Sequence, residues 1–153
     1  MMDLEALLRS HTPQFLIYVA PAGTGFDQVR ALANHTGTVA RILRGNKALT
    51  CQALFDEGAA ACQFPPYFGD NWDAFLDCLR DLRWLPGKSM VLVVTHALHL
   101  LEKEAPEEWK HWAKVVQTAT QEMSQEVPPR SLQVVLHATA EEEAALRKRL
   151  QTI

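Results

Sequence analysis

The stretch "SMVLVVTHA" (Ser89 to Ala97) constrains the fold of this 153-residue chain more than any other segment. It is a continuous apolar run, rich in β-branched residues, without alternation of apolar and polar side chains. Such runs are typical of parallel strands that are buried on both faces. We therefore expect a parallel β-sheet whose strands are connected by helices.

Other segments alternate between strand and helix patterns. We expect further strands in residues 14–23, 38–46 and 131–138, because each is short, apolar and β-rich. Helical spacing of apolar residues predicts helices over 26–37, 48–63, 70–84 and 139–153, and one or two helices over 98–126. The first of these helices is expected to end at Gly37, since glycine favours helix C-termini. Pro106 is well placed to begin the second helix if the stretch 98–126 forms two. Thr139 followed by Glu142 is a capping-box pattern. The order predicts an α/β layer fold with a small parallel sheet.

Composition limits the class of protein. Hydrophobic residues make up 48% and charged residues 22%, as in ordinary globular domains. The net charge of -3 argues against a general nucleic-acid binder, which would be markedly basic. Cys51, Cys62 and Cys78 fit no zinc spacing, and neither a secretory signal nor a membrane span is visible. We expect a single-domain cytoplasmic protein with reduced thiols, without a cofactor or a membrane contact.

The segment "FPPYFGDNWDAFLDCLRDLRWLP" (Phe64 to Pro86) places four aspartates within twelve residues. On a helix, this acidic row (Asp70, Asp73, Asp77 and Asp81) falls within an arc of about 80°, opposite the apolar side. Asp70 and Asp73 come early, where aspartate can cap N–H groups and suits the helix dipole. Asp77 and Asp81 repel their neighbours by about 0.2–0.5 kcal/mol per pair.

Two interpretations of the acidic row remain open. It is either a solvated face, with Arg80 offsetting part of the repulsion, or an interface for a basic partner. Tyr67 precedes the row, and tyrosine is enriched in the cores of interfaces. Gly69 lets the chain turn into the helix.

The same segment resembles the signature of the barstar family, the intracellular inhibitors of barnase-type secreted ribonucleases. The matching residues span about 15 positions, and they are Pro65, Tyr67, Phe68, Gly69, Asn71, Asp73, Ala74, Asp77, Cys78 and Leu79. The order of predicted strands and helices from Thr38 to about Ala138 also fits the family.

The resemblance implies a non-enzymatic protein with three parallel strands packed against helices. It implies that the signature helix and the loop before it cover a ribonuclease active site. Tyr67 would pack on the partner, Asp73 would pair with its basic residues, and Asp77 would occupy the catalytic phosphate site. A carboxylate would thus replace the phosphate of RNA. Further partner-binding residues implied are Phe68, Gly69, Asn71 and Asp81.

The chain departs from the best-known family member in three places. Leu76 stands where that member has tryptophan on the signature helix. An acidic contact on a later helix falls near Thr118, and Glu122, one turn on, is the substitute we expect. Residues 1–37 have no counterpart, and we expect them to add a parallel strand and a helix to a core of residues 38–138 and a C-terminal helix of residues 139–153.

Competing chemistry has weaker support. The acidic row lies on one predicted helix, whereas metal sites and acid–base pairs usually converge from several elements. His96 and His99 lack the further ligands that zinc needs, so we interpret them and His137 as structural. Trp109 and Trp112 have the spacing of core residues.

Two hypotheses follow from the sequence. In the first, the chain inhibits a barnase-like ribonuclease or a toxin domain of that type. In the second, it is a barstar-like interaction module for another basic protein. The partner-binding residues are the same in both hypotheses: Tyr67, Phe68, Gly69, Asn71, Asp73, Asp77, Asp81 and Glu122.

Overall fold

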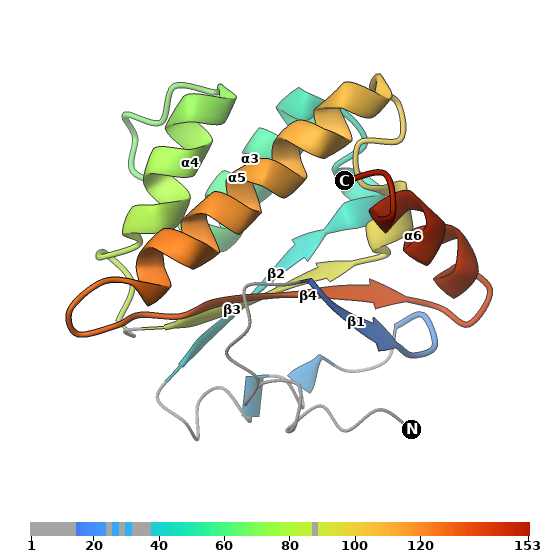
Figure 1. Ribbon diagram of the computed structural model, residues 1–153, viewed down its shortest axis with the longest axis horizontal. Helices are drawn as coiled ribbons and strands as arrows, with labels where there is room; N and C mark the ends of the chain where they lie inside the picture. The colour runs from blue at the N-terminus through green and yellow to red at the C-terminus, as the bar shows by residue number, and fades with distance from the viewer. Residues whose placement is uncertain (1–14, 24–25, 28–29, 32–37, 87–88) are drawn as a thin grey trace.

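A parallel four-stranded sheet forms the base of the molecule (Figure 1). The computed structural model describes residues 15–23, 26–27, 30–31, 38–86 and 89–153. The strands lie in the order β1-β4-β3-β2 and are β1 (Leu16–Val19), β2 (Val39–Arg44), β3 (Met90–Thr95) and β4 (Leu132–Ala138). All neighbouring strands are parallel, which confirms the predicted α/β fold and the extra N-terminal strand.

The helices lie mainly on one side of the sheet. In Figure 1, three of them cross above it: α3 (Cys51–Cys62), α4 (Trp72–Asp81) and α5 (Pro106–Ser124). The last helix, α6 (Glu143–Leu150), lies at the far end of the molecule from α4. Short 3-10 helices, Gly45–Lys47 and Ala97–His99, follow β2 and β3.

Several predicted helix limits differ from the observed ones. Of the one or two helices expected over 98–126, one is observed: α5 begins at Pro106, as predicted for the second helix, and only a short 3-10 helix and turns precede it. The helix expected over 70–84 is the shorter α4, because Leu82 adopts a left-handed conformation that ends it. The helix expected over 26–37, with its end at Gly37, lies largely outside the described residues.

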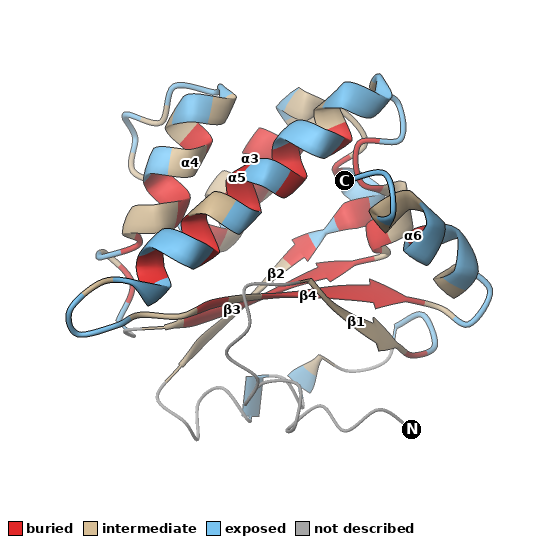
Figure 2. Ribbon diagram, in the orientation of Figure 1, coloured by how far each residue is buried: buried red, intermediate tan, exposed pale blue. Residues whose placement is uncertain are grey.

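The central strand β3 is buried along its whole length (Figure 2), as its apolar run predicts. Met90, Leu92 and Val94 belong to the main core between sheet and helices. Val91 and Val93 point to the other face, where they pack with Val135 of β4. Both faces of β3 are therefore shielded from water.

Trp109 and Trp112 of α5 lie in the main core, as predicted from their spacing. Their side chains are 1% and 0% exposed, and the two rings stack with their centroids 5.2 Å apart. Burial of such large side chains fixes α5 against the sheet. Because α4 packs on α5, the position of α5 in turn determines where α4 lies.

Gly58 lies in the middle of α3, where glycine lowers helix stability by up to about 1 kcal/mol. The packing of α4 explains its presence. A Cβ atom built at Gly58 would lie 2.7 Å from Cε2 of Phe75, which is closer than side chains tolerate. The missing side chain therefore allows the Phe75 ring of α4 to pack directly on α3.

The capping pattern before α6 is present in part. The N–H of Thr139 donates to Oε1 of Glu142 at 2.9 Å, which is the glutamate half of a capping box. The regular helix starts only at Glu143, one turn after Thr139.

Within the described part of the chain, no helix is long and apolar enough to cross a membrane.

Candidate functional site: an acidic face on α4 and α5

The start of α4 is fixed by Asn71. Its side-chain Oδ1 accepts a hydrogen bond from the N–H of Ala74 at 2.8 Å, and its Nδ2 donates to the carbonyl of Gly69 at 3.0 Å. The expectation that Asp70 caps the helix is wrong, since the N-cap is Asn71 and Asp70 has a left-handed φ of 51°. Asparagine and aspartate cap equally well, so the sequence could not decide between neighbours.

Gly69 is required by this cap. A Cβ atom at Gly69 would lie 3.2 Å from Nδ2 of Asn71, which is tighter than nearly all real contacts. A larger residue would push the Asn71 side chain away from the helix start. Gly69 and Asn71 are both residues of the predicted site. In the structure they form the turn that sets the direction of α4.

The loop before α4 has one aromatic residue facing inward and one facing outward. Phe68 is half-buried and packs edge-on against Phe55, Phe64 and Phe75, with ring centroids 5.1–6.3 Å apart. Tyr67 is 76% exposed, although large aromatic side chains usually bury most of their surface. The Phe68 anchor thus holds the loop while the Tyr67 ring stands in solvent.

A second anchor holds the first turn of α4 against α5. The indole Nε1 of Trp72 donates to Oε2 of Glu108 at 2.7 Å, and the thiol of Cys51 on α3 lies 3.0 Å from the same oxygen. The hydrogen bond with Cys51, followed by that from Trp72, lowers the pKa of Glu108. Burial, together with Glu108, raises the pKa of Cys51 to about 12, which excludes this thiol as a nucleophile at neutral pH.

The acidic face consists of Asp73, Asp77 and Asp81 on α4 together with Glu122 on α5. Asp73 and Asp77 are exposed one turn apart, whereas Asp81 is half-buried. Among the described residues, Asp73 has no hydrogen-bond or ion-pair partner. The helix dipole at the first turn of α4 favours its charge.

Glu122 reaches the same face from α5. One guanidinium joins it to α4: Arg80 Nη1 lies 3.1 Å from Oε2 of Glu122, and Arg80 Nη2 lies 2.5 Å from Oδ1 of Asp77. The hydrogen bond to Glu122, with Asp77 adding to it, raises the pKa of Arg80. Thr118, the other position considered on α5, is half-buried.

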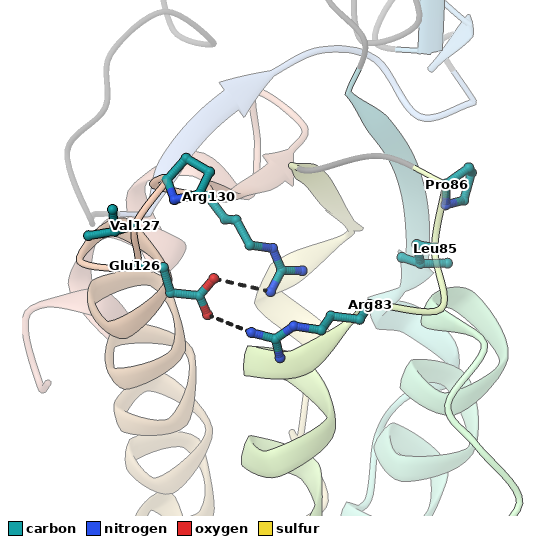
Figure 3. A pocket seen from close by; sticks show the side chains of 7 residues that line it. Arg83, Leu85, Pro86, Glu126, Val127 and Arg130 are labelled. Carbon is teal, nitrogen blue, oxygen red and sulfur yellow. Dashed lines mark ion pairs between the residues drawn. The ribbon is translucent and has the colours of Figure 1, made fainter.

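Asp81 belongs to a second ion-pair group at the end of α4. Its Oδ1 lies 2.9 Å from Nη1 of Arg83, and Nη2 of Arg83 lies 3.6 Å from Oε1 of Glu126. Figure 3 shows the Glu126 carboxylate between Arg83 and Arg130. Nη1 of Arg130 lies 3.6 Å from Oε2 of Glu126. The carboxylate of Asp81 is therefore already paired within the chain.

His96, His99 and His137 lie together near the carboxyl ends of β3 and β4, close to the start of α6. His111 lies on α5, with its ring centroid 6.4 Å from that of Trp72. His137 is fully buried; its Nδ1 accepts from the N–H of His96 at 3.0 Å and its Nε2 lies 3.0 Å from the carbonyl of Ala20. Burial is the main cause that lowers the pKa of His137. Nε2 of His99 lies 3.0 Å from Oε2 of Glu142. In the described ranges, no three His, Cys, Asp or Glu side chains are grouped to hold a metal ion.

Comparison with known protein families identifies the fold and the signature segment. The family model described as Barstar (barnase inhibitor) matches residues 38–146. The chain belongs to the barstar family. The barstar match includes β2, β3 and β4, the three helices above the sheet and the first part of α6, and it leaves β1 before its start. The comparison with curated proteins found no match.

The structure brings together most of the residues predicted for the barstar-like interface. Tyr67, Asp73 and Asp77 are exposed on one loop and the helix that follows it, and Glu122 joins them from α5. Phe68 packs inward, and the exposed Gly69 and Asn71 form the turn and the cap at the start of α4. Two features were missed: the Trp72–Glu108 hydrogen bond, which spans 36 positions, and the double pairing of Arg80. No short sequence pattern signals contacts between residues this far apart.

Proposed function

We propose that this chain inhibits a barnase-type ribonuclease by placing α4 and the loop before it over the cationic active site of the enzyme. The observation that carries the proposal is the pair of exposed carboxylates of Asp73 and Asp77, held one turn apart on a helix of the barstar family. An active site that binds RNA phosphates presents cations, and a carboxylate forms strong charge-assisted hydrogen bonds with such cations.

The roles of the individual residues in this proposal are those that the resemblance to the barstar family implies, and Tyr67, Asp73 and Asp77 are exposed as these roles require. Asp77 takes the place of the reacting phosphate, and Asp73 pairs with basic side chains beside it. Tyr67 is 76% exposed and packs on the enzyme surface. Asp81, which already pairs with Arg83, lies at the rim, where charges affect the association rate more than the affinity. Glu122 lies beside Asp77, to which Arg80 joins it.

The supports behind the face explain how a small acidic surface could bind tightly. Asn71 and Gly69 fix the start of α4, Phe68 anchors the loop, and Trp72 is bonded to Glu108. Since these groups are already ordered, binding costs little conformational entropy. Such an inhibitor would protect the cytoplasm of the cell that makes the ribonuclease or toxin, as an immunity protein does.

A titration tests the proposal directly. We expect the chain to bind a purified barnase-type ribonuclease at micromolar concentration or below and to stop its cleavage of RNA at a one-to-one ratio. The association rate should fall as salt rises, because steering is screened over a Debye length of about 8–10 Å. Absence of binding at micromolar concentration in low salt would exclude this enzyme as the partner.

A second candidate function is a barstar-like interaction module that binds another basic protein. The pairing of Arg80 with Asp77 favours it, since this pairing weakens the acidic potential at the position that matters most for ribonuclease inhibition. A pull-down from the source organism separates the two functions. Recovery of a basic protein without ribonuclease activity, through a surface that Asp73→Ala and Asp77→Ala disrupt, would support the module.

A further inference from the structure

Arg80 bridges two carboxylates that belong to different helices. Its guanidinium contacts Asp77 on its own helix at 2.5 Å and Glu122 of α5 at 3.1 Å. A guanidinium has five N–H donors in a planar fork that matches carboxylates. The carboxylates of Asp77 and Glu122 are therefore placed so that one guanidinium, that of Arg80, contacts both.

We propose that Arg80 is an internal substitute for a cation of the partner, and that the partner's arginine displaces it from between Asp77 and Glu122. This inference rests on the proposed function, because it assigns a partner cation to Asp77. The inference makes Arg80 a residue that determines affinity and specificity. A partner without a guanidinium group at this position does not displace Arg80 from Asp77 and Glu122, and it therefore binds more weakly.

The surroundings of Arg80 allow it to leave. Its side chain is 42% exposed, and those of Asp77 and Glu122 are 64% and 47% exposed. The two carboxylates are its hydrogen-bond partners among the described residues. A surface hollow of about 360 Å³, lined by acidic and basic side chains of α4, α5 and the segments that follow them, surrounds the guanidinium and leaves room for movement.

Arg149 of α6 shows what a fixed arginine looks like in the same molecule. Its guanidinium stacks on the Trp109 ring at 4.0 Å from the centroid and donates to the carbonyl of Leu98 at 2.8 Å. A cation of the partner does not compete for the Trp109 ring or the Leu98 carbonyl that hold Arg149. It can compete for the carboxylates that hold Arg80, because it offers them an equivalent bond.

The inference predicts the unusual result that deleting an interface residue strengthens binding. Arg80→Gln frees both carboxylates and removes a positive charge from the path of the partner's cation. We expect the Kd for a barnase-type ribonuclease to fall about tenfold, since two exposed ion pairs no longer have to be broken. Arg80→Lys keeps the charge and should bind close to the unsubstituted chain.

Arg147→Gln is the matched control. Arg147 is also exposed and paired with a carboxylate, Glu143, but it lies on α6, away from the acidic face. The substitution Arg147→Gln changes the net charge by the same amount as Arg80→Gln, so the Kd of this variant measures the long-range effect of charge alone. We expect less than about a twofold change from it, because α6 lies at the far end of the molecule from α4 and salt screens the interaction of distant exposed charges. Equal Kd values for Arg80→Gln and Arg147→Gln would overturn the inference, as would weaker binding by Arg80→Gln.

A second probe separates failure of the inference from failure of the proposed function. A peptide of six arginines supplies guanidinium groups without a ribonuclease. Calorimetric titration should show tighter binding of the peptide to Arg80→Gln than to Arg147→Gln, whether or not the ribonuclease binds the unsubstituted chain. If the ribonuclease does not bind while the peptide discriminates, the proposed function fails and the role of Arg80 stands. If the ribonuclease binds and neither probe discriminates, the role of Arg80 is wrong.

Discussion

Helices α4 and α6 both begin with carboxylates, but they use them differently. At α6, Glu142 is 14% exposed and bonds to the N–H of Thr139 and to His99. The next carboxylate, Glu143, pairs with Arg147 on its own helix at 2.9 Å. At α4, Asp73 has no partner in the described part of the chain, and Asp77 shares one arginine with Glu122.

This difference shows which charges serve the fold and which remain available. A shielded carboxylate with several partners stabilises the chain, because losing it leaves donors unsatisfied. An exposed carboxylate contributes little to stability, so its presence needs another explanation. On this basis the carboxylates at the start of α6 have a structural role, and those of Asp73 and Asp77 on α4 remain available for the proposed interface.

The largest expected effect tests the binding side of the comparison. Asp77→Ala should weaken binding to a barnase-type ribonuclease by at least about 2 kcal/mol, roughly thirtyfold, because it leaves a partner cation unpaired. Its free energy of unfolding should change by less than about 0.5 kcal/mol. Calorimetry and urea denaturation measure the two quantities.

Two further variants control this result. Glu141→Ala removes an equal charge at an exposed position just before α6 and should leave binding unchanged. Asp81→Ala should weaken binding less than Asp77→Ala does, since Arg83 already pairs with Asp81. Equal small losses from Asp77→Ala and Asp81→Ala would mean that the row is only a solvated surface.

The next effect tests the structural side. Glu142→Ala should lower the free energy of unfolding by about 1–3 kcal/mol, because the N–H of Thr139 loses its acceptor in a shielded place. Binding to the ribonuclease should not change. Glu143→Ala, one residue on, removes an exposed pair and should cost less than about 0.5 kcal/mol. Similar costs for the two variants would contradict the distinction between them.

The smallest effect concerns pH. The hydrogen bond to Glu102, helped by Glu142, raises the pKa of His99 above its ordinary value. A raised pKa in the folded state means that the charged imidazole stabilises the fold fully below about pH 6.5, and that this stability is lost as pH rises through the higher folded value.

His99→Gln should therefore cost more stability at pH 5.5 than at pH 8.5. The difference should stay below about 1 kcal/mol because the pair is partly exposed. Denaturation curves at the two pH values measure it. The neutral, buried His137 acts in the opposite direction, since its pKa is lowered, so the comparison must be made between variant and parent at each pH. A larger cost at pH 8.5 would show that the sign is wrong.

Local rules in the sequence determined much of this protein. The apolar run of β3 predicted a strand buried on both faces, Pro106 marked the start of α5, and the spacing of apolar residues gave α4 its core side. These features act over a few residues, through backbone hydrogen bonding and side-chain periodicity. The signature from Tyr67 to Leu79 pointed to the barstar family for the same reason, being contiguous.

Tertiary structure alone decided how these pieces meet. It placed the first strand, β1, beside the last one, β4, and it allowed Phe75 to pack where Gly58 has no side chain. It also joined Arg80 to Glu122, 42 positions away. Such contacts depend on the order of strands and the packing of helices, which no local pattern encodes. The acidic row and the nearby Arg80 were readable in the sequence, but the ion pair that links Arg80 to Glu122 depends on the packing of α4 on α5.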